Sequence, residues 1–171
     1  MYIYKAAVLG GGTMGGSIAQ VITFSGIPVV IKDVDEKAVQ KALDKVRSIY
    51  ESRVKKGKMT PNEIEPKIVL ASGTTSYDDF SDVDIVIEAV PEDMKIKKQV
   101  FKELDEICPE STILATNTSA LSISEIDSAE VLVARIVLSG QISSSSLNTC
   151  FLIFISSGTA SMTISTSEKS S

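Results

Sequence analysis

A glycine-rich stretch near the N-terminus has the residue types and the spacing needed to bind phosphate. Gly10, Gly12 and Gly15 form the pattern G-x-G-x-x-G directly after a short apolar run at residues 3–9. Between a strand and a helix, these glycines permit a tight turn, a close approach of backbone to phosphate, and close packing of the helix on the strand. The N–H groups and the dipole of the following helix would face the phosphates. On its own, the pattern also fits a glycine-rich turn without a ligand.

An acidic residue about twenty positions further on favours a dinucleotide over other phosphate ligands. Asp33 lies at the end of a predicted strand at residues 27–34, where its carboxylate could accept hydrogen bonds from ribose hydroxyls. The same carboxylate would repel a 2′-phosphate, so NAD is favoured over NADP. Asp33 could instead cap the next helix, but Asp35 suits that role better. Lys32 and Lys37 are evidence for NADP instead, because either lysine could approach a 2′-phosphate.

Hydrophobic periodicity predicts alternating strands and helices that would position this loop. Apolar runs predict strands at residues 3–9, 27–34, 67–71, 84–90 and 112–116, and a loop at 72–82. Helical spacing predicts helices at residues 17–25, 38–54 and 94–107. A capping box at residues 60–63 opens a further short helix, which Pro66 is expected to end. The alternation predicts an α/β fold, a doubly wound parallel sheet of the Rossmann type, with the glycine loop at the carboxyl end of its first strand.

Composition narrows the classes of partner and the compartment. The chain has 171 residues, 43% hydrophobic and 23% charged, which is ordinary for a soluble globular domain. A net charge of −5 without a basic stripe argues against nucleic acid, and no apolar run has the length of a membrane span. The first predicted strand starts almost at the N-terminus, so we expect no signal peptide. Two cysteines and no histidine give no disulfide framework and no metal spacing, so we expect a cytoplasmic protein without a metal.

Three blocks of sequence carry a resemblance to a known family. They are GGGTMG at residues 10–15, IEAVPEDMKIK at 87–97 and ATNTSALSI at 115–123. In this order and spacing they resemble the cofactor domain of the 3-hydroxyacyl-CoA dehydrogenases, over about residues 3–126. The resemblance implies an NAD-binding Rossmann domain at residues 1–126.

The resemblance also implies roles for individual residues. The whole loop, including Gly11, Thr13 and Met14, would hold the pyrophosphate. Glu92 and Lys97 match positions that contact the nicotinamide half of NAD, and Asn117 and Ser119 match the segment beside the nicotinamide and the reacting oxygen of the substrate. Ser119 is thus the candidate for a substrate hydrogen bond. Other roles are open for three of these residues: Glu92 could favour the helix dipole, Lys97 could be a surface lysine, and Ser119 could cap a helix.

A basic segment after the long predicted helix matches the region that lies near coenzyme A in this family. By charge, Lys56 and Lys58 are plausible partners for the coenzyme A phosphates. The match is loose at these positions, and a solvated basic turn is the favoured alternative because lysines are mostly exposed.

The sequence departs from the family after residue 126. The family continues through an arginine and a strand into a His-Phe-Phe-Asn-Pro segment, whose histidine is the general acid or base, and a glutamate further on orients it. Counting places Gly140 at the histidine, Ser143 at the asparagine and Leu152 at the glutamate, so the general base is not present in this sequence. Residues 127–171 form a divergent Ser/Thr-rich tail expected to complete or flank the sheet, and we expect the family's C-terminal helical domain to be absent. Two explanations of the divergent tail are open. The first is a shifted reading frame or an uncertain sequence over a genuine dehydrogenase, and the second is a truncated gene product with a true tail.

Three functions follow as hypotheses. The first is an NAD-dependent 3-hydroxyacyl-CoA dehydrogenase or its cofactor domain, which transfers hydride between C3 of an acyl-CoA and NAD in chemistry of the fatty-acid β-oxidation type. The second is a dinucleotide-binding module without catalysis. The third is a Rossmann dehydrogenase of the β-hydroxyacid type, against which the blocks at residues 87–97 and 115–123 argue. We favour the first for the parent protein, with an acyl-CoA as substrate and a possible homodimer, and the second for this chain alone.

Overall fold

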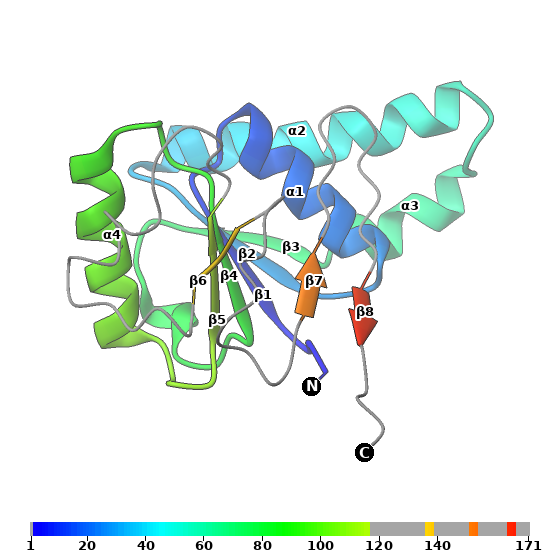
Figure 1. The fold of residues 1–171 in the computed structure, drawn as a ribbon. Helices are drawn as coiled ribbons and strands as arrows, with labels where there is room; N and C mark the ends of the chain where they lie inside the picture. Colours follow the sequence, from blue (N-terminus) through cyan, green and yellow to red (C-terminus); the bar gives the residue numbers. More distant parts are fainter. Residues whose placement is uncertain (1, 117–135, 139–150, 154–163, 167–171) are drawn as a thin grey trace, which may run out of the picture.

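A computed structural model describes residues 2–116, 136–138, 151–153 and 164–166 of the chain. Strands and helices alternate along most of this length (Figure 1). The strands are β1 (Ala6–Leu9), β2 (Val29–Lys32), β3 (Ala71–Thr74), β4 (Ile85–Glu88), β5 (Ile113–Thr116), β6 (Ile136–Leu138), β7 (Phe151–Ile153) and β8 (Ile164–Thr166). The helices are α1 (Thr13–Phe24), α2 (Glu36–Lys55), α3 (Pro61–Ile68), α4 (Met94–Ile107) and the short 3₁₀ helix η1 (Asp78–Phe80).

A parallel sheet forms the centre of the fold. Its described strands follow the order β3-β2-β1-β4-β5-β6, and every neighbouring pair is parallel. The chain therefore moves outward from β1 to one edge and then returns to build the other half. This reversal between β1 and β4 is the point where doubly wound sheets bind ligands, outside the carboxyl ends of the strands. The predicted doubly wound α/β fold is confirmed.

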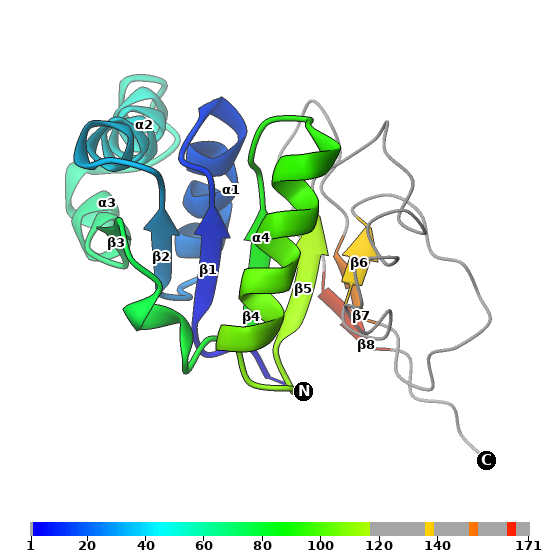
Figure 2. The ribbon, with the colours of Figure 1, turned by 90° about the vertical axis from the view of Figure 1, so that its left-hand side faces the viewer.

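Helices cover both faces of the sheet, as Figures 1 and 2 show. Successive strand residues point to opposite faces, so each strand contributes to two cores. On one face, Val8 and Ile31 pack with Ile22 of α1 and Tyr50 of α2. On the other face, the residues of α4 pack on the intervening strand residues, together with η1. This second core comprises Ala7, Leu9, Val30, Phe80, Val83, Val86, Val100, Phe101, Leu104, Cys108 and Leu114.

One stretch of the predicted secondary structure was wrong. Of the strand predicted at residues 67–71, residues 67–70 do not form a strand: α3 continues to Ile68, and β3 lies at Ala71–Thr74, mostly inside the predicted loop. Pro66 lies within α3 and does not end it. A proline removes the N–H that would bond the carbonyl four residues earlier, here that of Asn62. Because Asn62 is exposed, water can take that bond.

Three short strands lie within the tail that begins after residue 126. Ile136–Leu138 forms β6, which pairs in parallel with β5 at the edge of the main sheet. Phe151–Ile153 and Ile164–Thr166 form a separate antiparallel pair, β7 with β8. The tail therefore extends the sheet by one strand.

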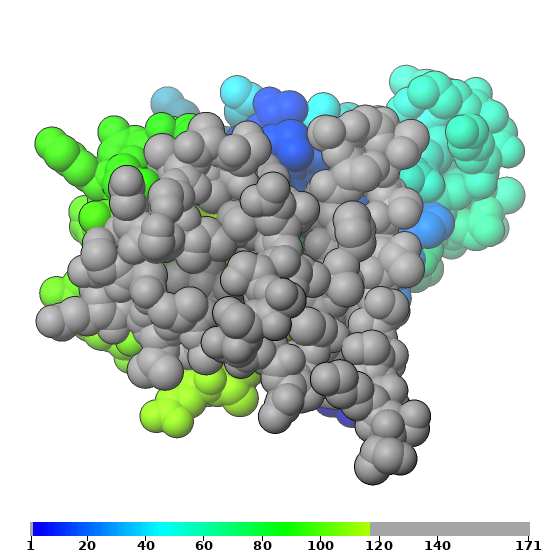
Figure 3. Space-filling model, in the orientation of Figure 1, coloured from blue at the N-terminus to red at the C-terminus, as the bar shows by residue number. Residues whose placement is uncertain are grey.

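In the space-filling view the α2–α3 end of the molecule protrudes at one corner (Figure 3).

The predicted capping box at the start of α3 is present and should make that helix sensitive to acid. The N–H and the hydroxyl of Thr60 both donate to Glu63 Oε2, at 2.6 and 2.7 Å. These bonds lower the pKa of Glu63 below its ordinary value of 4.5. Because the pKa is lower in the folded state, the stabilisation is present above 4.5 and is lost as the pH falls through the lower folded value.

We therefore expect the amide protons of α3 to exchange faster as the pH falls below about 4.5, after correction for intrinsic exchange. Glu63→Gln should remove this pH dependence, because a neutral amide does not titrate. Hydrogen exchange followed by NMR measures both. A Glu63→Gln chain that keeps the pH dependence would contradict the assignment.

Candidate functional site

The glycine loop joins β1 to α1 in a conformation that only glycine accepts readily. Gly10 has φ of 96°, in the left-handed region. A Cβ at Gly10 would lie 2.7 Å from the carbonyl oxygen of Ala89, in the segment after β4. A Cβ at Gly15 would overlap the carbonyl oxygen of Gly10 itself. The geometry thus agrees with the turn role predicted for Gly10 and the close-packing role predicted for Gly15.

The open side of the loop fits a pyrophosphate. Among the residues that the structure describes, no atom lies within 4 Å of a Cβ built on Gly12. Gly12, Thr13 and Met14 are exposed, and α1 begins at Thr13. The first N–H groups of a helix have no partner within the helix, and the positive end of its dipole attracts anions. In this described turn no acidic side chain opposes that attraction.

Asp33 lies beside the loop, as predicted, and also binds it. Its Oδ2 accepts a hydrogen bond from the N–H of Gly11 at 2.6 Å, and its Oδ1 accepts one from the N–H of Val34 at 2.7 Å. The side chain is half-buried and follows the last residue of β2. The bond to Gly11 was not predicted. It brings the carboxylate to the edge where the ribose next to a bound pyrophosphate would lie.

Lys32 points away from Asp33. Its ammonium lies over the ring of Tyr77, 4.2 Å from the ring centroid, on the face of the sheet that α4 covers. Tyr77 in turn donates to Glu103 at 2.8 Å, and burial together with this carboxylate raises the pKa of Tyr77 above its ordinary range. The cation–π contact favours this position of Lys32. Lys32, one of the two lysines that could have attracted a 2′-phosphate, is thus engaged elsewhere.

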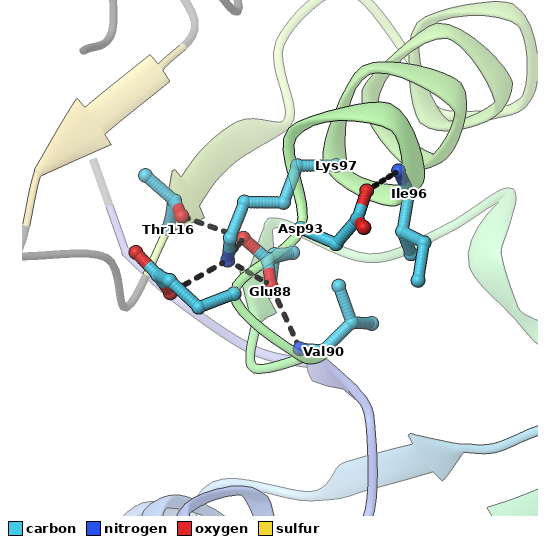
Figure 4. A network of polar contacts seen from close by, with 7 residues as sticks. Glu88, Val90, Asp93, Ile96, Lys97 and Thr116 are labelled. Atoms are coloured by element: carbon cyan, nitrogen blue, oxygen red, sulfur yellow. Dashed lines mark hydrogen bonds and ion pairs between the residues drawn. The ribbon is translucent and has the colours of Figure 1, made fainter. Parts of the chain in front are cut away.

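A buried polar network lies at the carboxyl ends of β4 and β5 (Figure 4). Glu88 and Lys97 are both fully buried. Lys97 Nζ donates to Glu88 Oε1 at 2.8 Å and to Glu88 Oε2 at 2.7 Å. Thr116 donates to Glu88 Oε2 at 2.6 Å, and the N–H of Val90 donates to Oε1 at 2.7 Å. Lys97 also pairs with Glu92 at 3.5 Å, and the Glu92 side chain is 40% exposed. The surface-lysine alternative for Lys97 is therefore excluded, and the structure brings Lys97 and Glu92 together.

Several predicted site residues lie apart from this edge or outside the described residues. Lys56 is the C-cap of α2, whose 20 residues separate it from Asp35 by about 30 Å, so it is not near the glycine loop. Asn117 and Ser119 lie outside the described residues, as do Gly140 and Ser143. Leu152 lies in β7. The roles predicted for these residues stay predictions.

The described residues contain neither a membrane-spanning helix nor a cluster of metal ligands. No helix among them is both long and apolar enough to cross a membrane. In the same part of the chain, no group of three or more His, Cys, Asp or Glu residues could hold a metal ion.

Comparison with known proteins identifies the fold and the loop together. The family model for the NAD-binding domain of 3-hydroxyacyl-CoA dehydrogenase matches residues 5–138. The chain belongs to this family. The predicted resemblance and the predicted cofactor, NAD, are confirmed. The match continues to the end of β6, beyond residue 126, where the motif resemblance stops.

Relatives of this NAD-binding domain come from both short and multifunctional enzymes. A 3-hydroxybutyryl-CoA dehydrogenase of Clostridioides difficile is 47% identical over 124 residues, which is 72% of this chain and 44% of that protein. A glyoxysomal fatty acid β-oxidation multifunctional protein of Cucumis sativus is 46% identical over 121 residues, 71% of this chain and 17% of that protein. The chain thus spans less than half of either relative.

Solved structures give the same result. The crystal structure of (S)-3-hydroxybutyryl-CoA dehydrogenase PaaH1 from Ralstonia eutropha superposes with a TM-score of 0.77 at 36% identity. The superposition covers 80% of this chain and 48% of that one. The family match at residues 5–138 includes the glycine loop, Asp33 and the network around Lys97.

Asp33 should set the preference for NAD, and one substitution tests this. Asp33→Asn keeps the size of the side chain but removes its charge. We expect NAD to bind about 10- to 100-fold more weakly, since charged hydrogen bonds are the stronger ones, and the preference for NAD over NADP to fall. Asp35→Asn removes the same charge two residues away and keeps a good N-cap for α2, so it should bind NAD normally. Calorimetric titration with both dinucleotides measures this, and equal losses in the two variants would contradict it.

Proposed function

We propose that this chain is the cofactor-binding part of an enzyme that transfers hydride between C3 of a 3-hydroxyacyl-CoA and NAD. The observation that carries the proposal is the glycine loop at the carboxyl end of β1, with the Asp33 carboxylate bonded to it. Family membership supports the cofactor and the class of reaction. The acyl-CoA substrate rests on the names of relatives such as the 3-hydroxybutyryl-CoA dehydrogenase.

The residues of this chain would bind and orient the cofactor. The N–H groups at the start of α1 would hold the pyrophosphate, because the positive end of the helix dipole lies at Gly12 and Thr13. Asp33 would accept hydrogen bonds from the adenosine ribose. Glu92 and Lys97 would contact the nicotinamide half at the carboxyl ends of β4 and β5. NAD itself supplies the hydride chemistry.

The acid–base step requires a group that this sequence does not show. Ser119 would hold the C3 oxygen, but an ordinary serine is too weak an acid or base to move the proton of that oxygen. Neither Gly140 nor Leu152, which stand at the family's histidine and glutamate, has a group that titrates. We therefore propose that the chain alone binds NAD without turnover, as a dinucleotide-binding module.

Calorimetry combined with an activity assay on the same preparation tests the proposal. The purified 171-residue chain is titrated with NAD and with NADP, and NADH oxidation is then followed with acetoacetyl-CoA. NAD binding without turnover is the expected result. Turnover would mean that residues 127–171 are not the tail of the working protein, and an absence of binding would refute the assignment of the glycine loop.

Compartment and assembly stay predictions. We expect a cytoplasmic protein, although one plant relative is named glyoxysomal and another peroxisomal. A homodimer is a possible assembly, and sedimentation of the purified chain would measure it. Nucleic acid is not expected as a partner because of the charge of the sequence, and a membrane is not expected because no apolar run has the length of a span.

A further inference from the structure

Glu88 is a buried acid to which neither the glycine motif nor the family resemblance gives a role. It is the last residue of β4, in register with Leu9 of β1 on one side and Thr116 of β5 on the other. It is fully buried at the carboxyl edge of the sheet, next to the segment that packs on Gly10. A charge in such a place is tolerated only when it is paired and hydrogen-bonded.

The hydrogen bonds of Glu88 leave it no capacity for a ligand. Oε1 accepts from the N–H of Val90 at 2.7 Å and from Lys97 Nζ at 2.8 Å. Oε2 accepts from Lys97 Nζ at 2.7 Å and from the hydroxyl of Thr116 at 2.6 Å (Figure 4). A carboxylate offers about four acceptor positions, and all four are used here. Any effect of Glu88 on a ligand must therefore act through its partners.

Lys97 is the partner that connects Glu88 to the cofactor site. Its ammonium has three protons. Two of them reach the two oxygens of Glu88, and Glu92 Oε2 lies 3.5 Å away on the exposed side. That distance is long for a direct hydrogen bond. Glu88 therefore fixes the Lys97 ammonium on its buried side. On its exposed side, the ammonium faces the Glu92 carboxylate.

The same carboxylate also braces the backbone beside the glycine loop. The bond from Val90 to Glu88 fixes the turn that follows β4. In that turn, the N–H of Ala89 donates to the carbonyl of Leu9 at 2.7 Å, which continues the ladder between β4 and β1. One buried group therefore orders both Lys97 and the backbone against which Gly10 packs. Groups ordered before binding lose less entropy when the ligand arrives.

We propose that Glu88 is a positioning residue for cofactor binding: it holds the Lys97 ammonium, and through it the Glu92 carboxylate, in the orientation that the nicotinamide half of NAD requires. The proposal rests on the proposed function, since it assumes that NAD binds at this edge. It predicts that the charge of Glu88 affects NAD affinity only while Lys97 is present, because the side-chain oxygen of Glu88→Gln can still accept the bond from Val90 and keep the turn after β4.

A double-mutant cycle tests this dependence. NAD affinity is measured by calorimetry for the parent chain, Glu88→Gln, Lys97→Met and the double variant, at a temperature where circular dichroism shows each to be folded. Glu88→Gln should weaken NAD binding about 10-fold, as expected when a charge-assisted bond that orders a binding group is lost. In the Lys97→Met background, Glu88→Gln should change the affinity by less than about twofold, because coupled residues are not additive.

Two further variants separate positioning from folding. Thr112→Val removes another buried hydroxyl bond, to the carbonyl of Val83 at 2.8 Å, at the amino end of β5. It should lower stability and leave NAD affinity unchanged. Thr116→Val removes the hydroxyl bond to Glu88 and keeps the charges of Glu88 and Lys97. It should weaken NAD binding about two- to fivefold, less than Glu88→Gln, because one hydrogen bond of the carboxylate is lost while its charge stays. Thr116→Val replaces Glu88→Gln in the test if Glu88→Gln does not fold.

Each remaining outcome has a definite meaning. Equal losses from Glu88→Gln in both backgrounds would overturn the proposal, because Glu88 would then act independently of Lys97. Normal NAD affinity in a destabilised Glu88→Gln, or in Thr116→Val if Glu88→Gln does not fold, would overturn it in favour of a purely structural role. A parent chain that does not bind NAD would refute the proposed function and this inference together, whereas binding by the parent without the predicted coupling would refute the inference alone.

Discussion

Lys97→Ala should lower the free energy of unfolding by about 3–5 kcal/mol, the usual cost of removing one partner from a buried ion pair. The substitution leaves Glu88 fully buried with two hydrogen bonds, from Thr116 and Val90, but without a counter-charge. Removal of the lysine stem also leaves a void against the sheet. Urea denaturation followed by circular dichroism measures the loss.

Lys95→Ala is the matched control for this prediction. Lys95 lies on the same helix but is exposed, so its removal should change the free energy of unfolding by less than about 0.5 kcal/mol. The double variant Glu88→Leu with Lys97→Met should recover much of the stability, because apolar pairs often replace buried ion pairs without loss. If Lys97→Ala and Lys95→Ala cost the same, the buried pair does not stabilise the fold.

Gly15→Ala should destabilise the chain by about 3 kcal/mol, at the upper end for overpacking. The added methyl group would overlap the carbonyl oxygen of Gly10, and backbone on both sides leaves no flexible side chain to move away. Either α1 must shift from β1 or the turn must open. NAD binding should be lost with it, since both changes displace the N–H groups at the start of α1.

Gly12→Ala provides the contrast within the same loop. The φ of Gly12 is −60°, which alanine adopts without strain, and its Cβ would meet no described atom. The free energy of unfolding should fall by less than about 1 kcal/mol, the cost of a poorer N-cap. NAD affinity should nevertheless fall at least about tenfold, because the methyl group occupies the space through which backbone approaches phosphate. Denaturation and calorimetry on both variants distinguish the two roles, and a Gly12→Ala chain that binds NAD normally would contradict the second.

The local pattern of the sequence was sufficient to predict the glycine loop and the acid at the end of β2. Both depend on residues close together in the chain, and the geometry of Gly10 and Gly15 agrees with their predicted roles. The Glu88–Lys97 pair was missed, although it left a signal. Lys97 occupies a core-facing position of an amphipathic helix, and Glu88 is the acid in an otherwise apolar buried strand. Two charges of opposite sign at buried positions suggest an ion pair. The sequence does not show that they are close enough to pair, because their separation depends on how α4 packs on the sheet.

The error at α3 and β3 has a different cause. Ile68, Val69 and Leu70 form an apolar run that resembles a strand, whereas Ile68 belongs to the last turn of α3 and packs on the core beside α2. The true strand, Ala71–Thr74, is small and partly polar. As the described edge of the sheet on that side, β3 has one strand neighbour and buries less side-chain surface, so its hydrophobic signal is weak.

The hydrogen bond between Asp33 and the N–H of Gly11 restricts how the preference for NAD can be changed by engineering. In dinucleotide-binding folds, an acid at this position suits the ribose hydroxyls of NAD, and a nearby arginine accommodates the 2′-phosphate of NADP. The simplest exchange would therefore remove the acid and add a cation. Here the acid also holds the glycine loop, at 2.6 Å. Alanine or glycine at position 33 would leave the amide of Gly11 without its acceptor and loosen the phosphate site for either dinucleotide. A successful exchange of cofactor must therefore keep an acceptor at this position, as asparagine does, and place the new positive charge elsewhere.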